Sequence, residues 1–149
     1  DSTRRRRTST RKQCSKKKVF SNLHSAKRGF QTVMCPGQKT YFDMAYNNAT
    51  SERGICWAAT IEASEIHSWK PLKDVDKDYH NLILGIQGQL WSETITKPEY
   101  IDTLINPRLA CLSELAWCSD NRRGWAEFQP TLLHNMKILS KLGWKYHNF

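Results

Sequence analysis

The sequence has no long apolar run. None of its stretches reaches the 18 or more apolar residues that would span a bilayer, so no membrane span is predicted. The chain begins at Asp1 rather than Met, and no apolar signal-peptide segment follows. We therefore expect either a processed chain or a piece of a longer polypeptide. A length of 149 residues is enough for one modest domain with a hydrophobic core.

Paired cysteine motifs are also missing. The five cysteines contain no Cys-x-x-Cys, and the five histidines are scattered, so neither a metal site nor a cofactor is predicted. The number of cysteines is odd, which favours buried thiols but leaves a disulfide open. The cysteines are Cys14, Cys35, Cys56, Cys111 and Cys118.

Acidic residues are scarce near the start of the chain. The whole sequence holds 23 Lys and Arg against 14 Asp and Glu, but nine of the basic residues lie in residues 1–18, where Asp1 is the only acid. We expect residues 1–28 to be a basic, disordered tail because they offer little apolar surface to bury. Such a tail can bind phosphates. The nearly neutral remainder shows no nucleic-acid module, so a solvated extension is the favoured interpretation.

Two segments have strand character. "RGFQTVMCPG" predicts a strand over Phe30–Cys35, and "LILGIQGQLW" predicts a second over residues 82–91. The second reads as buried on both faces, as in a parallel sheet or barrel. Gly85 and Gly88 interrupt it, which predicts close approach of another segment or a ligand. A long loop and a weakly periodic helix are predicted between the strands.

Three helices are predicted after the second strand. Thr96 to Glu99 reads as a capping box with Pro98 in the first turn. "RLACLSELAW" follows Asn106-Pro107 and is predicted to be buried nearly all round. The last helix has apolar residues at helical spacing and a glycine stop signal, namely Leu132, Leu133, Met136, Leu139, Leu142 and Gly143. This order describes part of an α/β fold, and two strands cannot cover their own edges, so we expect an incomplete chain.

An aromatic and an acidic residue follow each predicted strand. Trp91 and Glu93 point the same way because strand side chains alternate, and they lie at the strand end where α/β folds place their chemistry. Tyr41 and Asp43 repeat the pattern after the first strand. An aromatic floor with an acidic acceptor suits a neutral sugar. The alternative is that the aromatics only pack and the acids cap helices.

Five segments in order carry a resemblance to a known family. They are "GFQTVMCPGQKTYFDMAY", "ERGICWAA", "ILGIQGQLWSETI", "PRLACLSELAW" and "LSKLGWKYH". They resemble the family 20 glycoside hydrolases, the β-N-acetylhexosaminidases, and in particular the bacterial chitobiase type. The resemblance covers roughly Gly29 to Tyr146, so residues 29–149 are expected to be the C-terminal portion of the catalytic domain.

This resemblance implies a partial (β/α)₈ TIM barrel with its last two strands and closing helices. It implies hydrolysis of terminal N-acetylglucosamine or N-acetylgalactosamine from glycans or chitooligosaccharides. The route is retaining and substrate-assisted, since the substrate's acetamido oxygen attacks the anomeric carbon. Carried over by position, Tyr41 orients that oxygen, Asp43 and Glu93 bind sugar hydroxyls, Trp91 forms the pocket wall, and Trp57 stacks on the leaving-group sugar.

One departure from the family pattern concerns the general acid. The family's catalytic Asp-Glu pair has no counterpart, because no Asp-Glu dipeptide occurs in the sequence. Losing general-acid assistance removes about 10²–10⁴-fold in rate. The fragment is therefore expected to be inactive by itself, with a missing N-terminal half or a homo-oligomer completing the site. The alternatives are a non-catalytic basic binding module and an inactive truncated product. The resemblance implies a periplasmic, secreted or lysosomal location.

Overall fold

The computed structural model describes residues 21–49, 51–118 and 121–149. Within them, short helices surround a two-stranded sheet. The elements are α1 (Ser21–Lys27), β1 (Thr32–Met34), α2 (Gly37–Thr40), α3 (Ala63–His67), the 3₁₀ helix η1 (Lys77–Leu82), β2 (Ile83–Ile86), α4 (Glu99–Ile105), α5 (Arg108–Trp117) and α6 (Trp125–Lys141).

The two predicted strands pair in parallel, but the prediction that the second is buried on both faces is wrong, because no residue of β2 is fully buried and Leu84 is 60% exposed. Val33 of β1 faces Gly85 of β2 and Met34 faces Ile86, with an irregularity between Thr32 and Val33. Both strands are shorter than the predicted ranges. After Pro36 the chain leaves β1 and forms α2. Beyond α2, isolated bridges take the place of a regular ladder of hydrogen bonds between the two segments.

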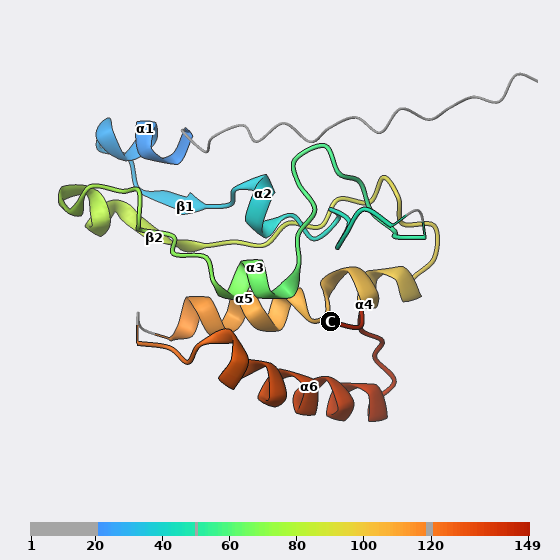
Figure 1. The fold of residues 1–149 in the computed structure, drawn as a ribbon. Coiled ribbons are helices and arrows are strands. Elements are labelled where there is room, and N and C mark those ends of the chain that lie inside the picture. Colours follow the sequence, from blue (N-terminus) through green and yellow to red (C-terminus); the bar gives the residue numbers. More distant parts are fainter. Residues whose placement is uncertain (1–20, 50, 119–120) are drawn as a thin grey trace, which may run out of the picture.

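The elements stack in layers beside the sheet (Figure 1). Helices α3 and α5 pack against each other below the sheet, and α6 lies below α5. The helices form because their apolar residues recur at helical spacing and turn toward a common core. This core joins side chains from every layer, namely Phe42, Met44, Ile61, Ile66, Cys111, Leu112, Leu115, Phe128, Leu132 and Met136.

The helix ends differ from the sequence predictions. The predicted capping box at Thr96 does not form, because α4 begins after Pro98 and no side chain caps it. A capping box is found instead at α3, between Glu62 and Glu65. Helix α5 is buried on one face only, since Trp117 is 93% exposed at its end.

The predicted tail falls largely outside the described residues, which begin at residue 21. Its last part, residues 21–27, forms α1 next to β1, so the helical region starts before the boundary at residue 28 that the charge pattern suggested. The cysteines also differ from expectation. Cys111 is buried, whereas Cys35 and Cys118 are partly buried and Cys56 is exposed. Cys14 lies outside the described residues.

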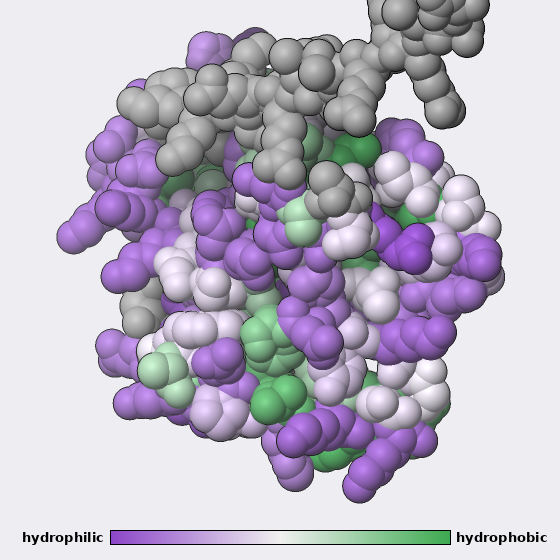
Figure 2. Space-filling view, turned by 45° about the vertical axis from the view of Figure 1, so that its right-hand side comes forward, coloured by the Kyte–Doolittle hydropathy of each residue, from purple (hydrophilic) through white to green (hydrophobic). Residues whose placement is uncertain are grey.

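The surface mixes polar and apolar regions. Figure 2 shows one face, on which a patch of hydrophobic side chains lies between hydrophilic ones. On the sheet, Val33 and Leu84 are exposed. None of the helices in the described part of the chain has both the length and the apolar character needed to cross a membrane.

Candidate active site

Helix α2 places the residues that follow β1 beside the residues that follow β2. After this single turn, the Phe42 N–H donates to the Gln89 carbonyl (2.7 Å), and the Gln89 N–H donates to the Thr40 carbonyl (2.9 Å). Tyr41 and Gln89 therefore form an isolated parallel bridge. As a consequence, the residues that follow the two strands lie next to each other, as the sequence predicted for neighbouring strand ends.

The aromatic side chains of the site meet around Tyr41. Its ring centroid lies 6.0 Å from that of Trp57, at an interplanar angle of 74°, and 6.2 Å from that of Trp91, at 56°. Both indoles are exposed, by 62% for Trp57 and 49% for Trp91. Three aromatic rings therefore form an open apolar surface that a sugar ring can contact with its C–H face.

Asp43 lies beneath this aromatic surface. Its side chain is almost wholly buried, at 1% exposure, and Oδ1 accepts a long hydrogen bond from the Trp91 N–H (3.4 Å). The other oxygen, Oδ2, has no hydrogen-bond partner among the described residues. Buried carboxylate oxygens are normally hydrogen-bonded. Oδ2 is thus an unused acceptor, but it is buried in this structure, so a hydroxyl group reaches it only if neighbouring side chains move.

The ionisation of Asp43 reflects opposing influences. Burial raises the pKa of Asp43 above its ordinary value of 3.8, and the carboxylate of Glu93 raises it further. Hydrogen bonds from the amides of Asp43 and Trp91 lower it, as does the positive charge of Arg108. Glu93 is exposed, and the interaction that links it to the other site residues is its electrostatic effect on Asp43.

Sequence reasoning missed the residues that hold the Asp43 backbone. The Nη1 atom of Arg108 donates to the carbonyls of Phe42 (2.8 Å) and Met44 (2.7 Å), on either side of Asp43. At Gly54, a Cβ atom would lie 2.6 Å from the Asp43 carbonyl oxygen, so only glycine fits there. One signal existed for Arg108, a basic residue at the first position of a helix whose other residues, apart from Ser113 and Glu114, are apolar.

Other parts of the described chain offer less to a ligand. No group of three His, Cys, Asp or Glu side chains in the described ranges is placed to hold a metal ion. A cavity of about 300 Å³ lies away from the aromatic surface, lined by residues that include Tyr46, Glu52 and His147. Of the five predicted site residues, Trp57, Trp91 and Glu93 are exposed, Tyr41 is partly buried and Asp43 is buried.

Comparison with known proteins gives a consistent result. A model of the family described as "Glycosyl hydrolase family 20, catalytic domain" matches residues 12–120, which begins upstream of Gly29, the first residue of the resembling segments. The chain is 29% identical over 123 residues to a β-N-acetylhexosaminidase of Cellulomonas fimi, covering 83% of this chain and 25% of that protein. It is 36% identical over 93 residues to a β-hexosaminidase of Vibrio furnissii, covering 61% of this chain and 15% of that protein.

Solved structures are similar over most of the chain. The exo-β-N-acetylglucosaminidase of Vibrio harveyi, determined in complex with N-acetylglucosamine, superposes with a TM-score of 0.79 at 33% identity, over 85% of this chain and 20% of that one. The N-acetyl-β-hexosaminidase of Streptomyces plicatus gives 0.77 at 25% identity, over 85% and 25%. The chain thus spans about a quarter or less of these relatives.

Proposed function

Because the chain belongs to glycosyl hydrolase family 20, we propose that it forms one side of a β-N-acetylhexosaminidase active site. The observation that carries this proposal is the contact of Tyr41 with both Trp57 and Trp91, above the buried carboxylate of Asp43. Aromatic rings beside a hydroxyl acceptor are the features that bind a neutral sugar. The proposed substrate class is therefore a glycan that ends in an N-acetylhexosamine.

Each residue has a proposed role that follows from its chemistry and position. The Tyr41 hydroxyl orients the acetamido oxygen of the substrate, which attacks the anomeric carbon. Trp91 packs against the sugar ring at the pocket wall, and Trp57 stacks on the leaving-group sugar. Asp43, through its unpaired Oδ2, and the exposed Glu93 accept hydrogen bonds from sugar hydroxyls.

The reaction needs a proton donor that these 149 residues do not supply. The family's general acid is the Glu of an Asp-Glu pair, and the sequence has no such pair. We therefore propose that a further polypeptide segment provides the acid and its Asp partner. Glu93 is not placed in that role, because we assign it to hydroxyl binding.

The position of the sheet in the complete fold is part of the same proposal. We assign β1 and β2 to the last two strands of a (β/α)₈ barrel, with the helices after β2 closing the ring. Their parallel pairing and the location of the aromatic and acidic residues past their C-terminal ends support this assignment. The exposed Val33 and Leu84 are then expected to pack against strands that this chain does not contain.

Sugar binding by the full chain tests the proposal. N-acetylglucosamine is titrated into ¹⁵N-labelled protein while the amide signals of the site residues are followed. We expect saturable shifts at Tyr41, Asp43 and Trp91. Glucose, which lacks the acetamido group, is expected to bind more weakly.

Two tryptophan variants test whether sugar binding takes place at the proposed site. Trp91→Ala removes stacking worth about 1 kcal/mol, so roughly a fivefold loss of affinity is expected. Trp117→Ala removes an indole that is 93% exposed at the end of α5, and no change is expected. Equal affinities for the two sugars, or equal losses in the two variants, contradict the proposal.

A further inference from the structure

The side chain of Arg108 is enclosed by the protein yet has no acidic partner. It is 0% exposed, and among the described residues no carboxylate lies within ion-pairing distance of it. Burying a guanidinium without a counter-ion is unfavourable unless other groups replace its hydration. The groups that replace it here therefore indicate what the residue does.

Those groups are two backbone carbonyls and an aromatic ring. Nη1 donates to the carbonyls of Phe42 and Met44, so one nitrogen joins the residue before Asp43 to the residue after it. The guanidinium carbon lies 3.4 Å from the centroid of the Tyr46 ring, within range of a cation–π interaction. Nε and Nη2 have no partner among the described residues, so the interactions are concentrated on the Asp43 segment.

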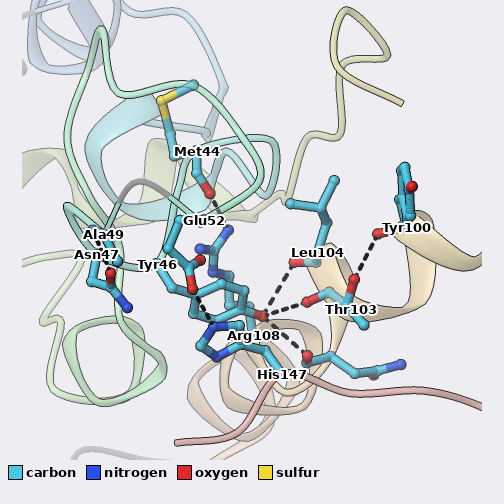
Figure 3. Close-up of polar contacts among 11 residues, drawn as sticks. Met44, Tyr46, Asn47, Ala49, Glu52, Tyr100, Thr103, Leu104, Arg108 and His147 are labelled. Carbon is cyan, nitrogen blue, oxygen red and sulfur yellow. Dashed lines mark hydrogen bonds and ion pairs between the residues drawn. The ribbon is translucent and has the colours of Figure 1, made fainter. Parts of the chain in front are cut away.

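Tyr46 in turn is held from its other side. The His147 ring stacks on it at 3.7 Å and 9°, and this close distance places His147 and Arg108 on opposite faces of the phenol. The Tyr46 hydroxyl lies 3.0 Å from the carbonyls of Thr103 and Asn106. Figure 3 shows Tyr46, Arg108 and His147 together, with the Arg108 hydrogen bond to the Met44 carbonyl; these contacts tie the Asp43 loop to α4 and the last residues.

We propose that Arg108 is a positioning residue for sugar binding, which fixes the backbone on both sides of Asp43 so that its carboxylate faces the sugar hydroxyls beside Trp91. This inference rests on the proposed function of the site. Arg108 does not touch the sugar in this scheme. It acts through Asp43, and its positive charge also helps to keep that buried carboxyl ionised and able to accept hydrogen bonds.

The first experiment needs no sugar and uses the full chain. In Arg108→Met, we expect the ¹³C-detected pKa of Asp43 to rise, because the nearby positive charge is lost. We also expect faster hydrogen exchange at the Trp91 amide, which donates to Asp43 Oδ1. Arg122→Met is the matched control, since Arg122 also bridges two carbonyls, those of His67 and Trp69, at the end of α3. Unchanged Asp43 titration and Trp91 exchange in folded Arg108→Met overturn the inference.

Arg108→Lys separates charge from geometry, and it serves if Arg108→Met does not fold. Lysine keeps the charge but lacks the planar guanidinium, which stacks on Tyr46 while one of its nitrogens bonds both carbonyls. We expect the Asp43 pKa to stay near that of the wild type while the Trp91 amide still exchanges faster. Trp91 exchange at the wild-type rate in Arg108→Lys contradicts the positioning role.

The second experiment is a double-mutant cycle on N-acetylglucosamine binding. Arg108→Met is expected to weaken binding about tenfold in the wild-type background and not at all in the Asp43→Asn background, because both changes remove the same contact. Equal weakening in both backgrounds indicates a general structural effect and overturns the inference. Absence of wild-type binding overturns the proposed function instead, and Arg108 is then judged on the Asp43 titration and Trp91 exchange alone.

Discussion

At the scale of single residues, Asp43 combines burial with an unpaired oxygen. Its carboxylate is 1% exposed, and Oδ2 has no partner in the described part of the chain. A buried acceptor without a hydrogen bond lowers the stability of the folded state by about 1–3 kcal/mol. A hydrogen bond from a ligand hydroxyl would remove that penalty. The free energy gained in this way would add to the affinity for the ligand.

This conflict between stability and binding gives a prediction for Asp43→Asn. The raised pKa means that folded Asp43 holds its proton more tightly than the unfolded chain does. Its contribution to stability is therefore greatest below the ordinary pKa of 3.8 and is lost as the pH rises through the folded-state value. A neutral amide avoids this loss, so we expect Asp43→Asn to be more stable than wild type at neutral pH and to lose sugar affinity.

Urea unfolding at neutral and at acidic pH measures the effect. The stability gain of Asp43→Asn should shrink as the pH falls, because wild-type Asp43 then becomes neutral as well. A variant that is less stable than wild type at neutral pH, or a gain that grows in acid, contradicts the prediction.

The residues of the site were accessible to sequence reasoning to different degrees. The position after two strand ends was enough to group Tyr41, Asp43 and Trp91, which the structure brings together. That Glu93 points the same way as Trp91 stays a prediction. Trp57 came only from the family resemblance, because nothing in its local pattern places it beside Tyr41. Arg108 escaped notice because hydrogen bonds to carbonyls 64 and 66 positions away leave no periodic trace.

At the scale of elements, the segment after β2 fits against the core through Gly88. A Cβ atom there would lie 2.5 Å from Cε2 of the Phe42 ring and 3.0 Å from Leu112. Phe42 is itself a core residue and cannot move aside easily. The prediction that the glycines in this run mark a close approach is confirmed at Gly88 and is wrong at Gly85, where an added Cβ atom meets nothing within 4 Å.

Gly88→Ala is therefore expected to destabilise the fold by roughly 1–3 kcal/mol through overpacking. Gly124→Ala is the matched control, because a Cβ atom at Gly124, which precedes α6, meets nothing within 4 Å. The free energy of unfolding in urea measures both variants. If the two variants are equally stable, the Phe42 ring has moved to accommodate the added methyl group, and the prediction of overpacking is wrong.

Element types were predicted more successfully than element ends. The two strands and the three helices after them are found because long apolar periodicity survives tertiary packing. The capping box at Thr96 does not form, since Pro98 precedes the helix there and no side-chain cap is made. Helices α1 and α2 were not predicted, because seven and four residues are too few to show a period.

At the scale of the whole molecule, our proposal is that the chain carries the aromatic and acidic side of a glycosidase site without its proton donor. We predict that the purified chain does not hydrolyse an aryl N-acetyl-β-glucosaminide, because the leaving-group oxygen would depart unprotonated. The measurement is release of the aryl group over a prolonged incubation, with the Cellulomonas fimi enzyme as positive control. Turnover that persists through repeated purification would show that the acid is present after all.

The last residues of the sequence are integrated into the fold. The His147 N–H donates to the Asn106 carbonyl at 2.9 Å, the His147 ring stacks on Tyr46, and Phe149 contacts Trp125. An affinity tag or fluorescent fusion appended after Phe149 would therefore disturb the contacts that hold the Asp43 loop in place. Labels for purification or imaging should therefore not be attached after Phe149.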